Sequence, residues 1–289
     1  MAWIALKRRS FVTAEQRAFQ RRLLANVRYE LIPLKSARSQ AQALPPGATV
    51  TVTASPAHGI DATLALAEWL QARQYQAVPH LSARLIRDRA HLRDVLQRAR
   101  AAGITQAFVV GGDPTGAEGL RDGLTLLRAM HDIGHPFEAI GVPAYPEGHP
   151  SISDDELRRA LEDKQPLAHS MTTQMSFDAA ALASWLVATR AAGIRLPMYL
   201  GLPGAVELRK LMTIAARIGI AGTARYAAKN RRLIGALLFQ RRYAPETLVG
   251  DLPPAMAAPE ATITGLHLFT FNQVGETVAW TRRMSEQLG

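Results

Sequence analysis

Two carboxylates lie where buried strands are predicted to end. Asp113 follows the apolar run 107–110 and a pair of glycines, and Glu30 belongs to the short run 27–33, which a proline stops. β-prone runs that end at Gly or Pro are typical of buried strands, and α/β enzymes carry their catalytic groups at the carboxyl ends of such strands. Glu30 and Asp113 are therefore candidate proton donors or acceptors, although a helix cap or a surface ion pair explains either one alone equally well.

Further polar side chains follow the other predicted strands. They are Thr53, His80, Tyr145 with Glu147 and His149, Gln174, and Asn272 with Gln273. Carboxylates, imidazoles and carboxamides together suit the binding of a polar heterocycle and the transfer of protons. Each histidine taken singly is more often a hydrogen-bonded structural residue. The chain has no Ser-His-Asp spacing, no H-E-x-x-H and no dense carboxylate cluster, so no metal site is predicted.

The elements that must position these side chains alternate along the sequence. Strands are predicted at 27–33, 49–54, 76–81, 107–110, 138–145, 168–174, 196–202 and 265–272. Nearly all of them precede a helical pattern, as is typical of a (β/α)₈ TIM barrel. An open doubly wound sheet is the alternative, but the glycine fingerprint that it usually carries is missing. We predict one α/β barrel domain over 1–289, with an N-terminal helix at 13–26 and a basic helical insertion at 222–242.

Composition indicates an ordinary globular protein. Hydrophobic residues make up 48% of the chain, and there is no cysteine for a disulfide, a thiolate metal site or a catalytic thiol. No apolar run approaches the roughly 20 residues that a membrane span needs. The first residues carry their charges after a very short apolar stretch, the reverse of a secretory signal. We therefore expect a cytoplasmic protein without a membrane segment.

The net charge of +10 favours anionic partners such as nucleic acid, acidic lipid or a polyanionic small molecule. The basic residues concentrate in two clusters. These are Arg17, Arg21 and Arg22, and then Lys229, Arg231, Arg232, Arg241 and Arg242. Such clusters are usually solvated helix faces, and no nucleic-acid-binding motif accompanies them, so we do not expect a nucleic-acid partner.

Six segments of the chain carry a resemblance to a known family, in the family's own order. They are Tyr29-Glu30-Leu31-Ile32-Pro33, Pro79-His80-Leu81, Gly111-Gly112-Asp113-Pro114, Ala144-Tyr145-Pro146-Glu147-Gly148-His149-Pro150, Thr173-Gln174 with Phe177-Asp178, and Gly265-Leu266-His267 with Phe271-Asn272. Together they resemble methylenetetrahydrofolate reductase, from about residue 29 to the end of the chain. The fourth segment is the most specific of them.

The resemblance implies a TIM barrel that reduces 5,10-methylenetetrahydrofolate to 5-methyltetrahydrofolate with hydride from NADH or NADPH. By the same match, Glu30 would be the general acid, and we expect Tyr29 and Leu31 to give it an apolar surround that raises its pKa. Asp113 would bind the pterin ring and help to stabilise the positive charge that develops in the reaction. Gln174 would hydrogen-bond the same ring, and Leu208 would take the place of a ring-stacking aromatic residue. The basic surplus suits a folate tail that carries several glutamates.

The resemblance also implies an FAD site with contacts at Thr53, His80, Gly112, Tyr145, His149 and Lys164. Two departures speak against the flavin. Gly111 replaces an arginine that would bind the flavin diphosphate, and Leu208 replaces the aromatic residue. Reductases of this kind without flavin pass hydride directly from NADH to the folate, and we expect that type here.

Several alternatives stay open on sequence alone. An FAD-dependent version of the same reaction is one, and a tetrahydrofolate-dependent methyl transfer on the same barrel is another. A third is a non-catalytic protein that binds folate or nucleic acid through the basic stretch 225–242. The choice between NADH and NADPH, the oligomeric state and the role of 222–242 are not predicted.

Overall fold

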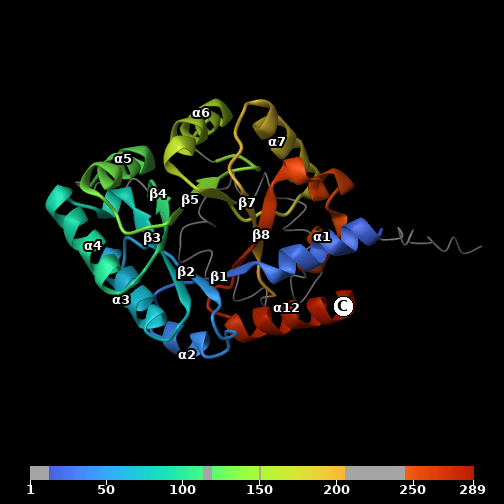
Figure 1. Cartoon of the computed structure of the whole chain (residues 1–289), viewed down its shortest axis with the longest axis horizontal. Coiled ribbons are helices and arrows are strands. Elements are labelled where there is room, and N and C mark those ends of the chain that lie inside the picture. The colour runs from blue at the N-terminus through green and yellow to red at the C-terminus, as the bar shows by residue number, and fades with distance from the viewer. Residues whose placement is uncertain (1–12, 113–118, 150, 206–244) are drawn as a thin grey trace, which may run out of the picture.

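The structure is a computed structural model that describes residues 13–112, 119–149, 151–205 and 245–289. Eight parallel strands close into a barrel in the order β1 to β8, which confirms the predicted TIM barrel and excludes the open sheet (Figure 1). The strands are β1 Val27–Leu31, β2 Thr49–Val52, β3 Gln76–Ser82, β4 Gln106–Val110, β5 Ala139–Ala144, β6 Ser170–Thr173, β7 Met198–Pro203 and β8 Ile263–Phe269. Their alternation with helices follows the apolar runs and turn residues of the sequence.

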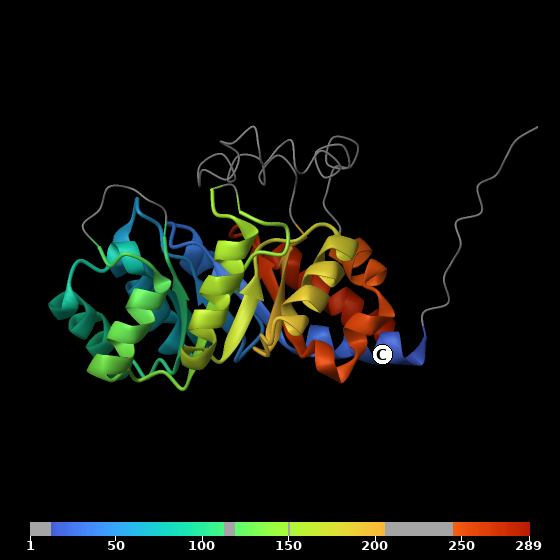
Figure 2. The ribbon, with the colours of Figure 1, turned by 90° about the horizontal axis from the view of Figure 1, so that it is seen from above.

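Helices surround the barrel in the described part of the chain. They are α1 Ala14–Ala25, α2 Ala37–Ala41, α3 Gly59–Gln71, α4 Arg89–Ala101, α5 Gly123–Ile133, α6 Asp154–Lys164, α7 Ala179–Ala191, α11 Pro245–Asp251 and α12 Val274–Leu288. Figure 2 shows α5, α6 and α7 along one side of the barrel. The predicted basic insertion at 222–242 lies outside the described residues. None of the described helices is long and apolar enough to cross a membrane.

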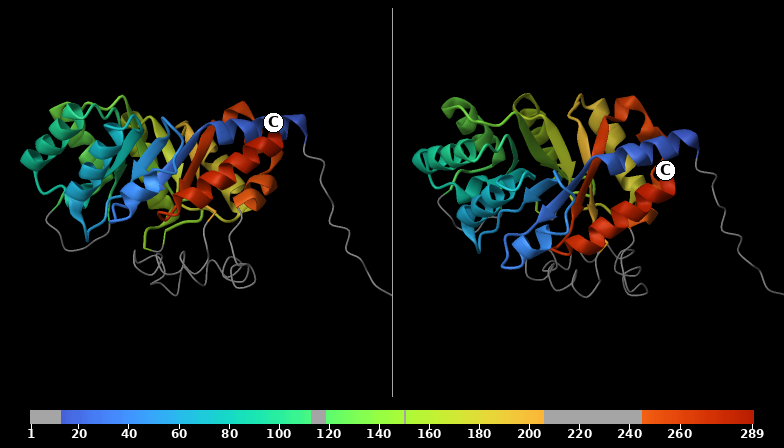
Figure 3. Two further views of the ribbon diagram at one scale, coloured as in Figure 1. Left: turned by 90° about the horizontal axis from the view of Figure 1, so that it is seen from below. Right: turned by 60° about the horizontal axis from the view of Figure 1, so that its bottom comes forward.

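The predicted N-terminal helix is α1, and it begins where the sequence indicates. Thr13 and Gln16 form a capping box, in which each side chain binds the backbone N–H of the other residue. α1 packs beside α12, as Figure 3 shows, and Arg21 donates a hydrogen bond of 3.0 Å to the carbonyl of Leu288. The first and last helices of the described part, α1 and α12, are thus in contact.

The inside of the barrel is unusually polar. Because side chains alternate along a strand, one face of each strand points into the barrel and the other faces the helices. Buried polar residues on inward faces include Arg28 and Glu30 of β1, Thr51 of β2, His80 of β3, Ser170 and Thr172 of β6, and His267 of β8. A TIM barrel usually fills this space with Val, Ile and Leu. These polar side chains indicate that the barrel binds a ligand at the carboxyl ends of its strands.

The same alternation corrects one expectation. Tyr29 and Leu31 flank Glu30 on β1 and therefore face outward, where the Tyr29 hydroxyl lies 3.1 Å from the Thr281 hydroxyl of α12. They do not form the apolar surround that we expected for the Glu30 carboxyl, because neighbours along a strand occupy opposite faces. The surround of Glu30 comes from other strands.

Candidate functional site

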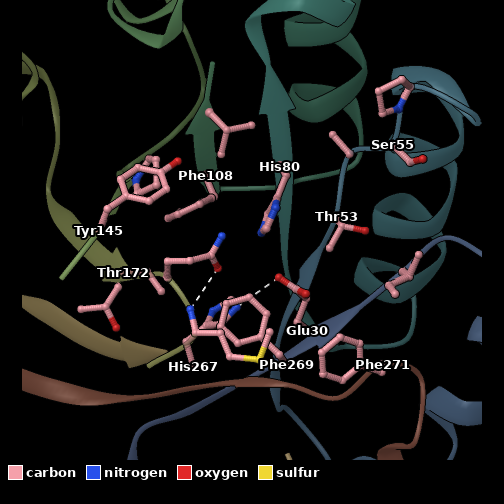
Figure 4. A pocket seen from close by; sticks show the side chains of 18 of the residues that line it. Glu30, Thr53, Ser55, His80, Phe108, Tyr145, Thr172, His267, Phe269 and Phe271 are labelled. Atoms are coloured by element: carbon pink, nitrogen blue, oxygen red, sulfur yellow. Dashed lines mark hydrogen bonds and ion pairs between the residues drawn. The ribbon is translucent and has the colours of Figure 1, made fainter. Parts of the chain in front are cut away.

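A cavity of about 620 Å³ opens at the carboxyl ends of the strands (Figure 4). Seven of the eight strands or the loops that follow them contribute to it: its polar lining includes Glu30, Thr53, His80, Tyr145, Thr172, Gln174 and His267, and its apolar lining includes Ile32, Phe108, Val110, Met175, Phe269 and Phe271. A cavity of this size with a few convergent polar groups is typical of a small-molecule site. The predicted residues Glu30, Thr53, His80, Tyr145 and Gln174 all meet here.

A buried pair lies at the floor of the cavity. The His267 Nε2 atom is 3.2 Å from the Glu30 Oε2 atom, and both side chains are at least nine-tenths buried. The sheet register sets this contact, because Glu30 pairs with Phe269 of β8 and His267 lies two residues earlier on the same face. An imidazole N–H can hold a carboxyl group in place and stabilise the carboxylate left after proton transfer.

Sequence reasoning missed His267 as a site residue. It belongs to the last matched segment, but nothing in its local spacing distinguishes it from a structural histidine. The inward alternation of His267 and Phe269 on the last strand was the available signal.

The end of β8 also holds the loop after β1. The Asn272 side chain accepts a hydrogen bond from the Ile32 N–H and donates one to the Ile32 carbonyl, each at 2.9 Å. Phe271 and Asn272 both have positive φ values, of 49° and 56°. Such strained backbone clusters at functional sites. Asn272, a predicted strand-end polar residue, therefore positions the loop beside Glu30 rather than a ligand.

His80 is buried inside the barrel beside two other rings. Its ring centroid lies 4.7 Å from that of Phe108 and 6.5 Å from that of His267. Burial, and to a smaller extent the neighbouring His267, lowers the pKa of His80 to about 3, so the imidazole is neutral at physiological pH. Its Nε2 atom has no hydrogen-bond partner within the described residues, and the same holds for the hydroxyl of Thr172. Buried polar atoms left unpaired at a cavity wall suit a ligand with a polar ring edge.

Two of the predicted cofactor residues, His149 and Lys164, lie outside the cavity lining. The rings of Tyr145 and His149 meet edge to face at 5.3 Å, but only Tyr145 lines the cavity. Lys164 ends α6 and is partly buried near Gly123 at the start of α5, where burial lowers its pKa and Asp122 opposes that shift. Asp113 and Leu208 lie outside the described residues.

The two glycines after β4 differ in what they allow. Gly112 has φ of +86°, and a Cβ there would lie 2.2 Å from the Ser82 hydroxyl, so this position requires glycine. At Gly111 the nearest atom to a Cβ would be the Gly123 nitrogen at 3.8 Å, which is an ordinary contact. A side chain could therefore be accommodated at 111. The missing arginine is a feature of this sequence and not a steric necessity.

Gln174 lines the cavity with a carboxamide that is partly engaged by the backbone. Its Oε1 atom accepts a hydrogen bond of 3.0 Å from the backbone N–H of Met175. The NH₂ group can donate to a ligand, and the second lone pair of Oε1 can still accept. No group of three His, Cys, Asp or Glu side chains placed to hold a metal is present among the described residues.

Glu147 follows β5 and joins two loops of the rim. Its Oε1 atom accepts hydrogen bonds from the backbone N–H groups of Phe177, at 2.7 Å, and Asp178, at 3.2 Å. The first loop carries Tyr145, and the second carries Gln174. This carboxylate, one of the polar groups predicted to follow the strands, therefore acts as a brace between two walls of the cavity.

Replacing Glu147 by alanine is expected to speed hydrogen exchange at the amides of Phe177 and Asp178 by about 10- to 100-fold, because hydrogen bonds to a charged acceptor are worth about 1.5–3 kcal/mol. Mass spectrometry of peptides covering 174–181 measures the change. The matched control is Asp178→Ala, which removes the N-cap that binds Ala180 and Ala181 and leaves Glu147 in place. Equal protection of Phe177 in all three proteins would contradict the brace.

Comparisons with known proteins bear on this site. The family model described as "Methylenetetrahydrofolate reductase" matches residues 31–219. Among curated proteins, "Methylenetetrahydrofolate reductase 1" of Schizosaccharomyces pombe (strain 972 / ATCC 24843) is 32% identical over 116 residues, which cover 37% of this chain and 19% of that protein. The chain thus spans about a fifth of the length of that relative.

A solved structure overlaps the barrel more loosely. It is titled "Crystal structure of a putative lyase/mutase from Burkholderia cenocepacia J2315", and it aligns with a TM-score of 0.44 and 14% identity over 75% of this chain and 93% of that one. The assignment of the fold here depends on the closed strand order and not on this overlap.

Proposed function

Since the chain belongs to the methylenetetrahydrofolate reductase family, we propose that it reduces 5,10-methylenetetrahydrofolate to 5-methyltetrahydrofolate with hydride from NADH or NADPH. The observation that carries this proposal is the buried Glu30–His267 pair at the floor of the cavity. In this pair His267 holds the Glu30 carboxyl group at a place that a polar heterocycle in the cavity can reach. The motif match of Glu30 to the family's general acid supports the same assignment.

In the proposed reaction, Glu30 gives its proton to the bridging nitrogen of the substrate as the methylene carbon–nitrogen bond breaks. The resulting iminium then accepts hydride from the reduced nicotinamide and becomes the methyl group. The His267 imidazole holds the Glu30 carboxyl and stabilises the carboxylate that remains. His80, neutral and unpaired at Nε2, is proposed to hydrogen-bond the bound rings. Gln174 and Asp113 are proposed to bind the pterin, and Leu208 to pack beside it.

We further propose that hydride passes directly from NADH to the folate without flavin. If FAD were bound, Thr53, His80, Gly112, Tyr145, His149 and Lys164 would hold it, and it would carry the hydride between the two substrates. Two features support the flavin-free version. Gly111 provides no cation for a diphosphate, and Lys164 is partly buried outside the cavity lining with a lowered pKa. Of the described residues that would meet the diphosphate, neither Gly111 nor Lys164 therefore offers an accessible cation.

The test is anaerobic NADH oxidation with 5,10-methylenetetrahydrofolate, by protein that has first been stripped of any bound cofactor. Loss of NADH matched by 5-methyltetrahydrofolate, without added flavin, is the expected result. If NADH is oxidised only after FAD is added, the reductase activity stands and direct hydride transfer is wrong. If NADH is not oxidised in either condition but the protein still binds folate, a methyl-transfer enzyme on the same barrel is favoured.

Gly111→Arg tests the account of the flavin separately. The substitution is expected to tighten FAD binding by about tenfold or more, because it restores a charge-assisted hydrogen bond to the diphosphate at a position with room for a side chain. Quenching of FAD fluorescence measures the affinity. Gly111→Gln, which adds a shorter polar side chain without charge, is the control. Equal FAD affinity in the wild type and both variants would show that Gly111 does not decide flavin binding.

A further inference from the structure

A group of polar side chains lies at the N-terminal end of the barrel, the end opposite the cavity. Its members are Arg28 of β1, Thr49 of β2, Gln76 of β3, Gln106 of β4 and Tyr199 of β7, each the first or second residue of its strand. The strand register places Thr49 beside Arg28 and Gln76 beside Thr49. We call this group the N-terminal ring, and none of its members lines the cavity.

Arg28 is the charged member of the N-terminal ring and is only 9% exposed. Its Nη2 atom lies 3.4 Å from the Gln106 Oε1 atom, and its guanidinium carbon lies 3.7 Å from the centroid of the Tyr199 ring. Because β4 is not a neighbour of β1 in the sheet, the contact with Gln106 crosses the inside of the barrel. The Arg28 side chain therefore occupies the barrel axis, where a TIM barrel usually has Val, Ile or Leu.

No carboxylate compensates the charge of Arg28 within the described ranges. The ion pairs found there do not include Arg28, and its two contacts, Gln106 and Tyr199, are not carboxylates. Burial lowers the pKa of the guanidinium and Tyr199 opposes that shift, but an arginine remains charged in a protein. A buried charge is normally paired, because it has lost its hydration. The N-terminal ring therefore favours an anionic partner.

The other members of the N-terminal ring connect Arg28 with solvent. Gln76 is exposed, and Thr49, Gln106 and Tyr199 are partly exposed. The Gln76 Oε1 atom accepts hydrogen bonds from the Thr49 hydroxyl, at 3.3 Å, and from the Gln106 Nε2 atom, at 3.4 Å. Both carboxamide oxygens thus accept bonds from within the ring. The Gln76 NH₂ group and further guanidinium N–H groups can donate to a ligand that enters from solvent.

From this placement we propose that the N-terminal ring binds a small inorganic anion, of the class of chloride and phosphate, on the Arg28 guanidinium. The anion supplies the counter-charge and accepts charge-assisted hydrogen bonds. Because Thr49, Gln76 and Gln106 bond one another across the entrance, the ring admits a small ion in preference to a large organic anion. The site lies at the opposite end of the barrel from the cavity, so it does not rest on the proposed reductase activity.

The test is line broadening in ³⁵Cl and ³¹P NMR spectra of chloride and inorganic phosphate, measured with the full chain. Sodium gluconate keeps the ionic strength constant, so that general screening does not change. The wild type is expected to bind at least one of the two ions with saturable broadening. Arg28→Gln is expected to weaken that binding by about tenfold or more, because it removes the charge-assisted hydrogen bonds.

Gln106→Glu tests the same site without removing the arginine. It places a carboxylate where the Gln106 oxygen now lies, 3.4 Å from Arg28, and so supplies the counter-charge from within the chain. We expect it to weaken anion binding as much as Arg28→Gln and to raise Tm at low chloride concentration. The control is Arg98→Gln, because it also removes one positive charge, but that charge is already compensated by Asp61 and Glu68. It should keep the wild-type affinity.

The relative broadening of the two ions identifies the ligand, since competition between them shows that they share one site. Absence of saturable broadening of both ions by the wild type would overturn the anion site. Wild-type affinity in Gln106→Glu would overturn it as well, because an anion on Arg28 must compete with that carboxylate. Loss of affinity in Arg98→Gln equal to that in Arg28→Gln would show that net charge, and not the N-terminal ring, attracts the ion.

Discussion

Replacing Glu30 by glutamine is expected to lower kcat for the proposed methylenetetrahydrofolate reduction by about 100-fold or more, because positioned general acids contribute about 10²- to 10⁴-fold. The amide has nearly the shape of the carboxyl group but cannot give up a proton. It can still bond His267, which lies 3.2 Å from the carboxyl oxygen, so the cavity keeps its form. The affinity for 5-methyltetrahydrofolate should therefore change by less than about threefold.

Single-turnover kinetics and a folate titration on the same preparation check this prediction. Glu30→Asp is the matched variant, because it keeps the acid but withdraws it from His267 by one methylene group. We expect its rate to fall between those of the wild type and Glu30→Gln. Near-normal turnover by Glu30→Gln would remove the general-acid role, and a parallel loss of folate binding would indicate a binding role instead.

The second large effect is a loss of stability in mild acid caused by His80. The unfolded chain protonates this imidazole near its ordinary pKa of 6.5, whereas the folded chain does so only near pH 3. Between these values the unfolded state binds more protons, so the free energy of unfolding falls as the pH is lowered. At pH 5 the cost is about 2 kcal/mol, from about 1.4 kcal/mol per pH unit. Above about pH 6.5 the contribution is fully restored.

His80→Gln keeps a polar side chain but cannot take up the proton. Urea unfolding at pH 7.5 and pH 5 is expected to show a loss of stability in the wild type that exceeds the loss in His80→Gln by about 2 kcal/mol. His58→Gln is the control, because His58 is exposed and its side chain makes no capping hydrogen bond to α3. The lowered pKa of the partly buried His135 is common to all three proteins, so its contribution cancels. Equal losses in the wild type and His80→Gln would show that His80 is not buried in its neutral form.

The strands and helices of this fold could be predicted from the sequence because the features that produce them are local. Short β-prone runs that end at Gly or Pro, as at 107–112, form strands, and the capping residues Thr13 and Ser153, both of types that favour helix N-termini, begin α1 and α6. Eight such units in sequence suffice to favour a barrel, because parallel strands need the helical crossovers that follow them. The five-residue helix α2 was missed, because it is too short to show a period of 3.6 residues.

The pattern of strands and helices was thus predictable from local sequence, and the motifs gave the residue types at the rim of the barrel. How those residues are used depends on the contacts that folding brings about. Glu30 and His267 are 237 residues apart, and they meet because the last strand closes on the first. In the sequence Glu147 is one more polar residue after a strand. In the structure its carboxylate accepts hydrogen bonds from two backbone amides of the loop after β6. Whether a segment forms a strand depends largely on its own residues. Which side chain it contacts depends on the distant strand that lies beside it.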